Sequence, residues 1–197
     1  MNILNANFNF ILNEIKDFSV DKLKLRSVLK DFPDFQEQNG ALFFRGATDA
    51  VAIAPGQITY VYSGKLNNID IQYIASILKD VNDLLEFEEV GRVELKMEGT
   101  DFVEQNSLQQ SLNKFSVIQD DLPTYIKGVG QRFIVNTEDY EGDLFLEPYI
   151  RNENNIFLRA QLLTYDVKNI TEISKSISGM LDIFQTDLVK LSKKMYK

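Results

Sequence analysis

The stretch QITYVYSGKLNNIDIQYIASILKDVNDLL, residues 57–85, joins a strand pattern to a helix pattern and decides the fold class. Its first part, Ile58 to Tyr62, is bulky on both faces, which is typical of a central strand or of one that also faces a partner. Its second part carries apolar residues at helical spacing behind a cap supplied by Asn68 or Asp70. These residues are Ile71, Ile74, Ile77, Leu78, Val81, Leu84 and Leu85. The stretch therefore predicts a strand followed by a long amphipathic helix.

Upstream of this stretch, the pattern predicts one strand, one helix and two further strands. Residues 4–12 alternate, with Leu4, Ala6, Phe8, Phe10 and Leu12 on one face and Asn5, Asn7 and Asn9 on the other. A helix capped by Ser19 and ending at Phe32, before Pro33, comes next. Strands over residues 41–45 and 50–54 follow, and a Pro-Gly turn leads into the strand at residue 57.

Downstream, the same order of elements recurs. A strand begins at Val90, and Asp101 with Glu104 has the spacing of a capping box for a helix that runs to Phe115. Three strands are predicted over residues 131–137, 143–150 and 155–166. The last helix is capped by Asn169 or Thr171 and extends to Leu191, with an apolar stripe along one side.

We therefore expect an α+β fold, with antiparallel sheet covered on one face by helices. Residues 1–88 and 89–197 would each form one β-α-β-β-β-α half, and the repeated order suggests an internal duplication. No linker rich in Gly, Pro or Ser separates the halves, so we expect them to be fused into one compact domain. Identity between the halves is slight, and chance recurrence of a common element order is the alternative.

The charge and composition exclude several classes of function. The 197 residues carry a net charge of −8, which opposes binding to the phosphates of nucleic acid. The chain has no His and no Cys, which excludes Ser-His-Asp and Cys-His hydrolases, thiolate metal sites and disulfides. We expect no enzyme activity, no catalytic or metal-ligating residue, and no cofactor.

The N-terminal segment and the hydropathy pattern indicate a cytoplasmic protein. Residues 1–12 are rich in Asn and carry no basic region, unlike a signal peptide. No apolar run approaches the roughly eighteen residues of a membrane span. We therefore expect no contact with a membrane.

Two acidic clusters are candidate sites. The loop from Glu138 to Asp143 lacks the alternating ligands of a calcium-binding loop, and we interpret it as the solvated tip of a hairpin. Glu86, Glu88 and Glu89 lie between a helix and a strand, where charge is ordinary and no pocket is indicated.

Aromatic residues supply the candidate interface. Tyrosine is favoured at interfaces because it combines a large apolar area with a polar tip. The candidates are Phe43, Phe44, Tyr60, Tyr62 and Tyr149. The alternative is that most of these rings fill the core between sheet and helices.

The segments Val93-Glu94-Leu95, Thr100-Asp101 and Leu162 to Val167, with the helix to Leu191, carry a resemblance over most of the chain. In this pattern the chain resembles a sporadically distributed family of uncharacterised bacterial proteins with duplicated α+β halves. That resemblance implies a fold and no activity. At the level of fold, one half is also similar to the SecB-like chaperones, which are acidic, cytoplasmic and oligomeric, although the early helix departs from their pattern.

These features together predict a non-enzymatic protein-binding module. We expect an acidic accessory, inhibitor or immunity-type protein, of the kind found in mobile elements and defence loci. The alternative is a SecB-like chaperone that binds unfolded or partner polypeptides. The sheet edges of such a fold also allow a homodimer.

Overall fold

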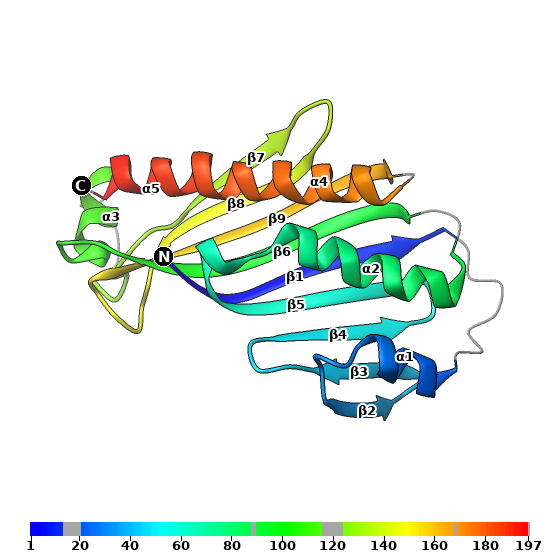
Figure 1. Cartoon of the computed structure of the whole chain (residues 1–197). Coiled ribbons are helices and arrows are strands. Elements are labelled where there is room, and N and C mark those ends of the chain that lie inside the picture. The colour runs from blue at the N-terminus through cyan, green and yellow to red at the C-terminus, as the bar shows by residue number, and fades with distance from the viewer. Residues whose placement is uncertain (14–20, 88–89, 116–123, 168, 197) are drawn as a thin grey trace.

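The computed structural model describes residues 1–13, 21–87, 90–115, 124–167 and 169–196. These residues form one nine-stranded antiparallel sheet in the order β2-β3-β4-β5-β1-β6-β9-β8-β7 (Figure 1). The strands are β1 (Asn2–Leu12), β2 (Asp34–Gln38), β3 (Ala41–Arg45), β4 (Asp49–Ala54), β5 (Gln57–Lys65), β6 (Val90–Phe102), β7 (Gln131–Asn136), β8 (Glu141–Pro148) and β9 (Asn155–Val167).

The helices lie on one face of this sheet, except α3, which lies at its end beside the C-terminus (Figure 1), so the expected α+β architecture is observed. They are α1 (Lys22–Val28), the short 3-10 turn η1 (Leu66–Asn68), α2 (Ile71–Leu85), α3 (Ser107–Phe115) and α4 (Ile170–Asp182). The chain continues from α4 through the π-helical segment η3 (Ile183–Leu188) into α5 (Val189–Met195). Helices α2 and α4 contact each other across the middle of the sheet.

A single apolar core fills the space between the sheet and the helices. Alternate residues of the central strands are fully buried, among them Phe8 and Phe10 of β1 and Leu95 of β6. The stripes of α2 and α4 meet them with Leu78 and Ile177. The predicted helical stripe of residues 71–85 is therefore confirmed as the face that packs on the sheet.

Side-chain caps start the two long helices where the pattern predicted. The Asp70 carboxylate accepts a hydrogen bond from Tyr73 N at 3.0 Å, so Asp70 caps α2 and Asn68 does not. Asn169 caps α4: its Oδ1 accepts from Glu172 N at 3.0 Å, and its Nδ2 donates to Glu172 Oε1 at 3.0 Å. The first of these bonds satisfies a backbone N–H that the first turn of a helix leaves unpaired, and the second links the two side chains.

The predicted cap at Asp101 is wrong. Asp101 lies inside β6, where it pairs with Ile156 of β9, because these two strands pair as far as Phe102. Helix α3 begins only at Ser107, and Asn106 Oδ1 accepts from Gln109 N at 3.0 Å in place of the expected carboxylate.

The first helix and the strand after it also differ from the prediction. Helix α1 is capped by Asp21 and ends at Val28, while Ser19, the expected cap, lies outside the described residues. Strand β2 was missed because its sequence, DFQEQ, has one apolar residue and no alternation. Residues 1–88 therefore contain a four-strand meander, β2 to β5, where three strands were expected.

The two ranges 1–88 and 89–197 meet at the centre of the sheet, where β1 pairs with β6. Helix α2 follows β5 on one side of this pair, and α4 follows β9 on the other. Of the helices in the described ranges, none is long and apolar enough to cross a membrane.

Candidate functional site

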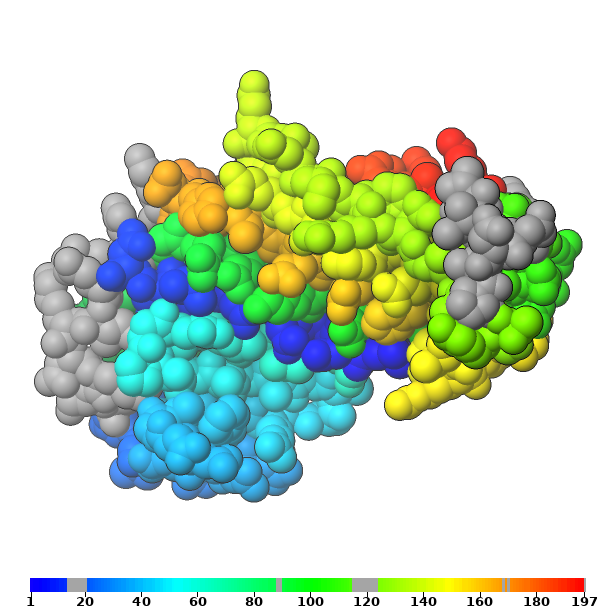
Figure 2. All heavy atoms as spheres, turned by 180° about the vertical axis from the view of Figure 1, so that it is seen from behind, coloured from blue at the N-terminus to red at the C-terminus, as the bar shows by residue number. Residues whose placement is uncertain are grey.

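We call the face of the sheet opposite α2 and α4 the open face. In Figure 2 the strands run across it as adjoining bands, from cyan through blue, green and orange to yellow, with no described helix over them. Most antiparallel sheets with one packed face expose polar side chains on the other. Asn7 of β1 and Lys96 of β6, which are direct neighbours, follow this rule.

A bulge in β1 brings a large apolar side chain to the open face. The pairing of β1 with β6 shifts register between Ile3 and Asn5, which breaks the alternation at the start of the strand. Ile3 is consequently buried, with 1% of its surface exposed, while Leu4 is 41% exposed. The predicted assignment of Leu4 to the core face is therefore wrong.

Leu4 lies beside three other large apolar residues at the end of the sheet. Phe157 of β9 and Tyr149, which follows β8, stack with ring centroids 6.3 Å apart and an interplanar angle of 16°. Ile150 is 83% exposed. We call Leu4, Tyr149, Ile150 and Phe157 the end patch.

The end patch lines a hollow of about 360 Å³ whose remaining lining residues are Glu147, Pro148 and Arg151. A second hollow of about 370 Å³ shares Glu147, Pro148 and Ile150 with the first and is lined beyond them by residues 125–130 and Leu108. Tyr125, in this second hollow, is 76% exposed. The apolar surface therefore continues past the end of β8, bordered by the acidic Glu147 and the basic Lys127 and Arg151.

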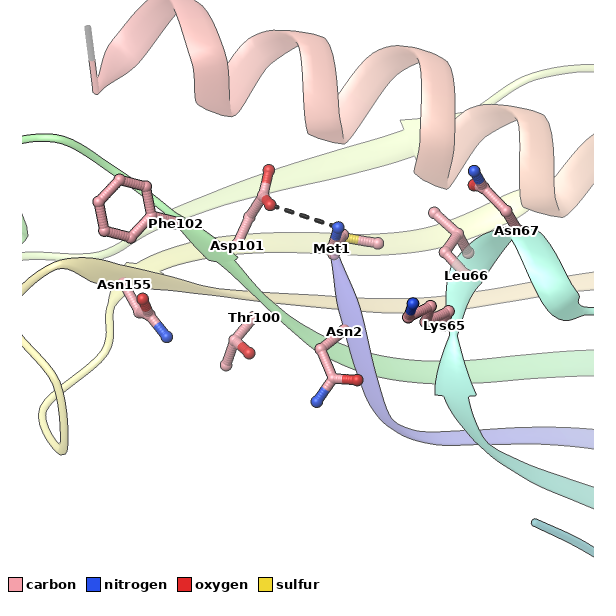
Figure 3. A pocket seen from close by; sticks show the side chains of 9 residues that line it. All are labelled: Met1, Asn2, Lys65, Leu66, Asn67, Thr100, Asp101, Phe102 and Asn155. Atoms are coloured by element: carbon pink, nitrogen blue, oxygen red, sulfur yellow. Dashed lines mark ion pairs between the residues drawn. The ribbon is translucent and has the colours of Figure 1, made fainter.

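A third hollow, of about 430 Å³, lies at the same end of the sheet. Figure 3 shows that Asp101 points toward the Met1 nitrogen, at 3.5 Å, while Thr100 and Asn155 point to the opposite side. Phe102, 69% exposed, also lines it. Its lining mixes the apolar residues Met1, Leu66 and Phe102 with polar ones, so we regard it as a margin of the apolar surface.

Stacked cations lie beside the end patch on the open face. The Arg159 guanidinium carbon is 4.0 Å from the centroid of the Phe145 ring, and that of Arg132 is 5.6 Å from it. Arg132 also donates two hydrogen bonds to Asp143, at 2.8 and 2.9 Å. This bidentate pair holds the pKa of the Asp143 carboxyl below its usual range.

Three of the five predicted interface residues are buried under the helices. The exposed fractions of Phe44, Tyr60 and Tyr62 are 0%, 5% and 7%. Tyr60 donates to Asp49 Oδ2 at 2.9 Å, and burial, more than this hydrogen bond, raises the pKa of its hydroxyl. The prediction is wrong for these three residues because their strands turn those side chains into the core.

The other two predicted residues lie on the open face but far apart. Phe43 is partly exposed on β3, opposite Ala52, whereas Tyr149 belongs to the end patch, and five strands separate β3 from β8. The interpretation of the acidic loop as a hairpin tip is confirmed, because Glu138 and Asp139 are exposed in the turn between β7 and β8.

Sequence reasoning missed Leu4, Phe157 and Ile150. Alternation could have found Phe157, because it lies between Ile156 and Leu158, whose side chains are both buried. The exposure of Leu4 depends on the bulge in β1, and no feature of the sequence indicates that bulge. Within the described ranges, no group of three or more Asp or Glu residues could hold a metal ion.

Comparisons with known proteins add little. No protein-family model and no curated protein matches the chain. Among solved structures, the chain is similar to crystal form I of the protein TP0453, with 8% identity over 89% of this chain and 94% of that chain. The TM-score of 0.18 is too low to carry an argument about fold or function.

Proposed function

We propose that the chain is a non-enzymatic protein-binding module whose end patch contacts the partner. The end patch carries the proposal: four large apolar side chains from β1, β9 and the end of β8 converge on a sheet face that no described helix covers. Contiguous apolar surface of this kind usually marks a site of protein association.

The chemistry of the end patch favours a protein partner. Aromatic and long aliphatic anchors supply most of the binding energy at protein interfaces, while a polar rim sets orientation. The stacked rings of Tyr149 and Phe157 hold each other in place, so little side-chain entropy is lost on binding. Glu147 and Arg151 provide one charge of each sign at the rim.

The test is a tagged pull-down from native lysate of the source cells at moderate salt, with bound proteins identified and their ratio measured. We expect one partner at a near-equal ratio, captured equally by the wild type and by Leu23→Glu. Leu23 is 77% exposed on α1, away from the end patch, so this variant adds the same charge elsewhere. Ile150→Glu should reduce capture at least about tenfold, because a charge is desolvated in the apolar contact.

Undiminished capture by Ile150→Glu would refute the end patch as the binding surface. Turnover of any substrate that depends on a particular Glu or Asp would refute the non-enzymatic reading altogether.

The alternative, a SecB-like chaperone, is favoured by one observation. The four antiparallel strands β2 to β5 are followed by the long helix α2, which is the element order of that fold. A chaperone would suppress aggregation of a reduced client protein at a stoichiometric ratio, and Ile150→Glu would weaken that suppression. A lack of suppression by the wild type would remove this alternative.

We also propose that the two halves arose by duplication. The order β5-β1-β6-β9 is symmetric about the β1–β6 pair, and Figure 1 places α1 and α3, which follow β1 and β6, toward opposite ends of the sheet. Sequences of relatives test this proposal, since the two halves should align with each other better than shuffled sequences do.

A further inference from the structure

Strand β7 forms one edge of the sheet. Its hydrogen bonds to β8 determine which of its residues direct their N–H and C=O groups away from the sheet. Thr137 N donates to Tyr140 O at 2.9 Å, so Thr137 faces β8. Residues of an antiparallel strand alternate in direction, and the β7–β8 register runs without a shift. The N–H and C=O groups of Arg132, Ile134 and Asn136 therefore point outward, where no described strand pairs with them.

The side chains of β7 leave apolar surface on both sides of this edge. Ile134 is 70% exposed on the open face. Phe133 and Val135, on the helix side, are only partly buried. Arg132 is the one charged residue of the strand, and Asp143 of β8 already neutralises it.

The opposite edge, β2, is protected. It carries Asp34 and Glu37, and Lys22 of α1 forms an ion pair with Glu37 at 2.6 Å. Arg26 of α1 lies over the Phe35 ring, 5.4 Å from its centroid. Charges and a covering helix are the usual devices that prevent strand addition at an edge, whereas β7 carries only the charge of Arg132, which Asp143 neutralises.

We infer that β7 is the interface of a homodimer in which two copies pair β7 with β7, antiparallel, about a two-fold axis at Ile134. Residues that face each other across a ladder must share a face of the sheet, and their outward backbone groups must meet. A two-fold axis at Ile134 satisfies both conditions. It pairs Ile134 with its own equivalent and Arg132 with Asn136 in both directions, and each of these three residue pairs makes two hydrogen bonds, about six in all. No other two-fold register brings all three outward residues into pairs.

The same register is complementary in its side chains, which favours a second copy over an unrelated strand. Ile134 faces its own equivalent on the open face, and Phe133 faces Val135 on the helix side, so apolar surface is buried on both faces. Arg132 faces Asn136, so no like charges meet. The two sheets become continuous, with both end patches on the same side.

Sedimentation of the full chain over a range of concentrations tests the dimer. The wild type should sediment at twice the 22.6 kDa of the chain. Ile134→Lys should raise the dimer dissociation constant at least about a hundredfold, because a two-fold axis makes every substitution act twice. Leu23→Lys, on exposed surface of α1, should leave it unchanged, and far-UV circular dichroism checks that each variant folds. A monomeric wild type, or an Ile134→Lys variant that dimerises normally, overturns the inference.

Disulfide trapping tests the register, and the chain has no native cysteine to interfere. In a hydrogen-bonded pair the Cα atoms lie about 5.5 Å apart, within disulfide range. Ile134→Cys should therefore cross-link under mild oxidation at least about tenfold faster than Leu23→Cys. Arg132→Cys mixed with Asn136→Cys should cross-link, and either one alone should not. Equal rates for Ile134→Cys and Leu23→Cys would overturn the dimer, and cross-linking of Arg132→Cys alone would overturn the register.

Discussion

Because of the bulge at the start of β1, the burial of Ile3 and Leu4 is the reverse of what simple alternation predicts. Alternation extended from Phe8 and Phe10 places Leu4 in the core, whereas the structure buries Ile3 and exposes Leu4. A methyl group added to Gly99 of β6 would lie 3.3 Å from Ile3 Cδ1, which shows that Ile3 packs closely against β6. The two alanine variants, Ile3→Ala and Leu4→Ala, should therefore differ strongly in stability.

The size of each effect follows from burial. Truncating a buried Ile to Ala typically costs about 2–5 kcal/mol, and Ile3 near the end of its strand belongs at the low end, about 2–3 kcal/mol. Leu4 keeps 41% of its surface in water, so Leu4→Ala should cost below about 1 kcal/mol. With a urea dependence of about 2 kcal/mol/M, the midpoint falls by about 1–1.5 M for Ile3→Ala and by under about 0.5 M for Leu4→Ala.

Urea unfolding followed by far-UV circular dichroism measures both values, because the chain has no Trp for fluorescence. Ile3→Val, which removes a single methylene, should cost about 0.5–1.5 kcal/mol and serves as a graded control. A larger loss for Leu4→Ala than for Ile3→Ala would refute the bulge. It would also remove Leu4 from the end patch.

Further outcomes follow from the caps, the tyrosines and the faces of β3. Asn169→Ala should destabilise the chain by about 1 kcal/mol in urea, since Glu172 N loses its acceptor, while Asn169→Asp keeps the cap. Burial raises the pKa of Tyr73 to about 12, so its contribution to stability is present below pH 10 and is lost as the pH rises through 12. Tyr73→Phe should reduce the alkaline loss of stability, and absorbance at 295 nm reports the titration. Phe44→Ala should cost about 3–5 kcal/mol and Phe43→Ala under about 1 kcal/mol, because only Phe44 is fully buried.

Contrary results have distinct meanings. Equal stability of Asn169→Ala and Asn169→Asp would show that the side chain does not cap α4. A Tyr73 titration near pH 10 would show that its hydroxyl is solvated, and equal costs at Phe43 and Phe44 would show that the two faces of β3 are buried to the same extent.

Local patterns predicted the long helices and the central strands well. The stripe of residues 71–85 and the caps at Asp70 and Asn169 are short-range features, so the sequence determines them directly. Strand β2 depends on pairing with β3 across the turn at Asn39 and Gly40, and the extension of β6 through Asp101 depends on pairing with the distant strand β9. No periodicity in the strand itself reports such pairing, and tertiary context overrides local preference there.

The candidate site was predicted only in part, for the same reason. Tyr149 was singled out by its residue type and lies in the end patch. Its neighbours Leu4 and Phe157 come from β1 and β9, and the strand order that brings them together is not visible in any local pattern. Phe44, Tyr60 and Tyr62 have the same chemistry as interface residues, and only the direction of each side chain assigns them to the core.

The central place of β1 has a consequence for biosynthesis. Translation produces β1 before both of its neighbours, which are β5, ending at Lys65, and β6, ending at Phe102. At about 5–20 residues per second, the ribosome completes β6 roughly 5 to 20 s after β1. During that interval at least one edge of β1 is unpaired in the nascent chain. An unpaired apolar strand edge is a template for aggregation. Protection of β1 by ribosome-associated chaperones should therefore govern the yield of folded protein more than protection of any later strand.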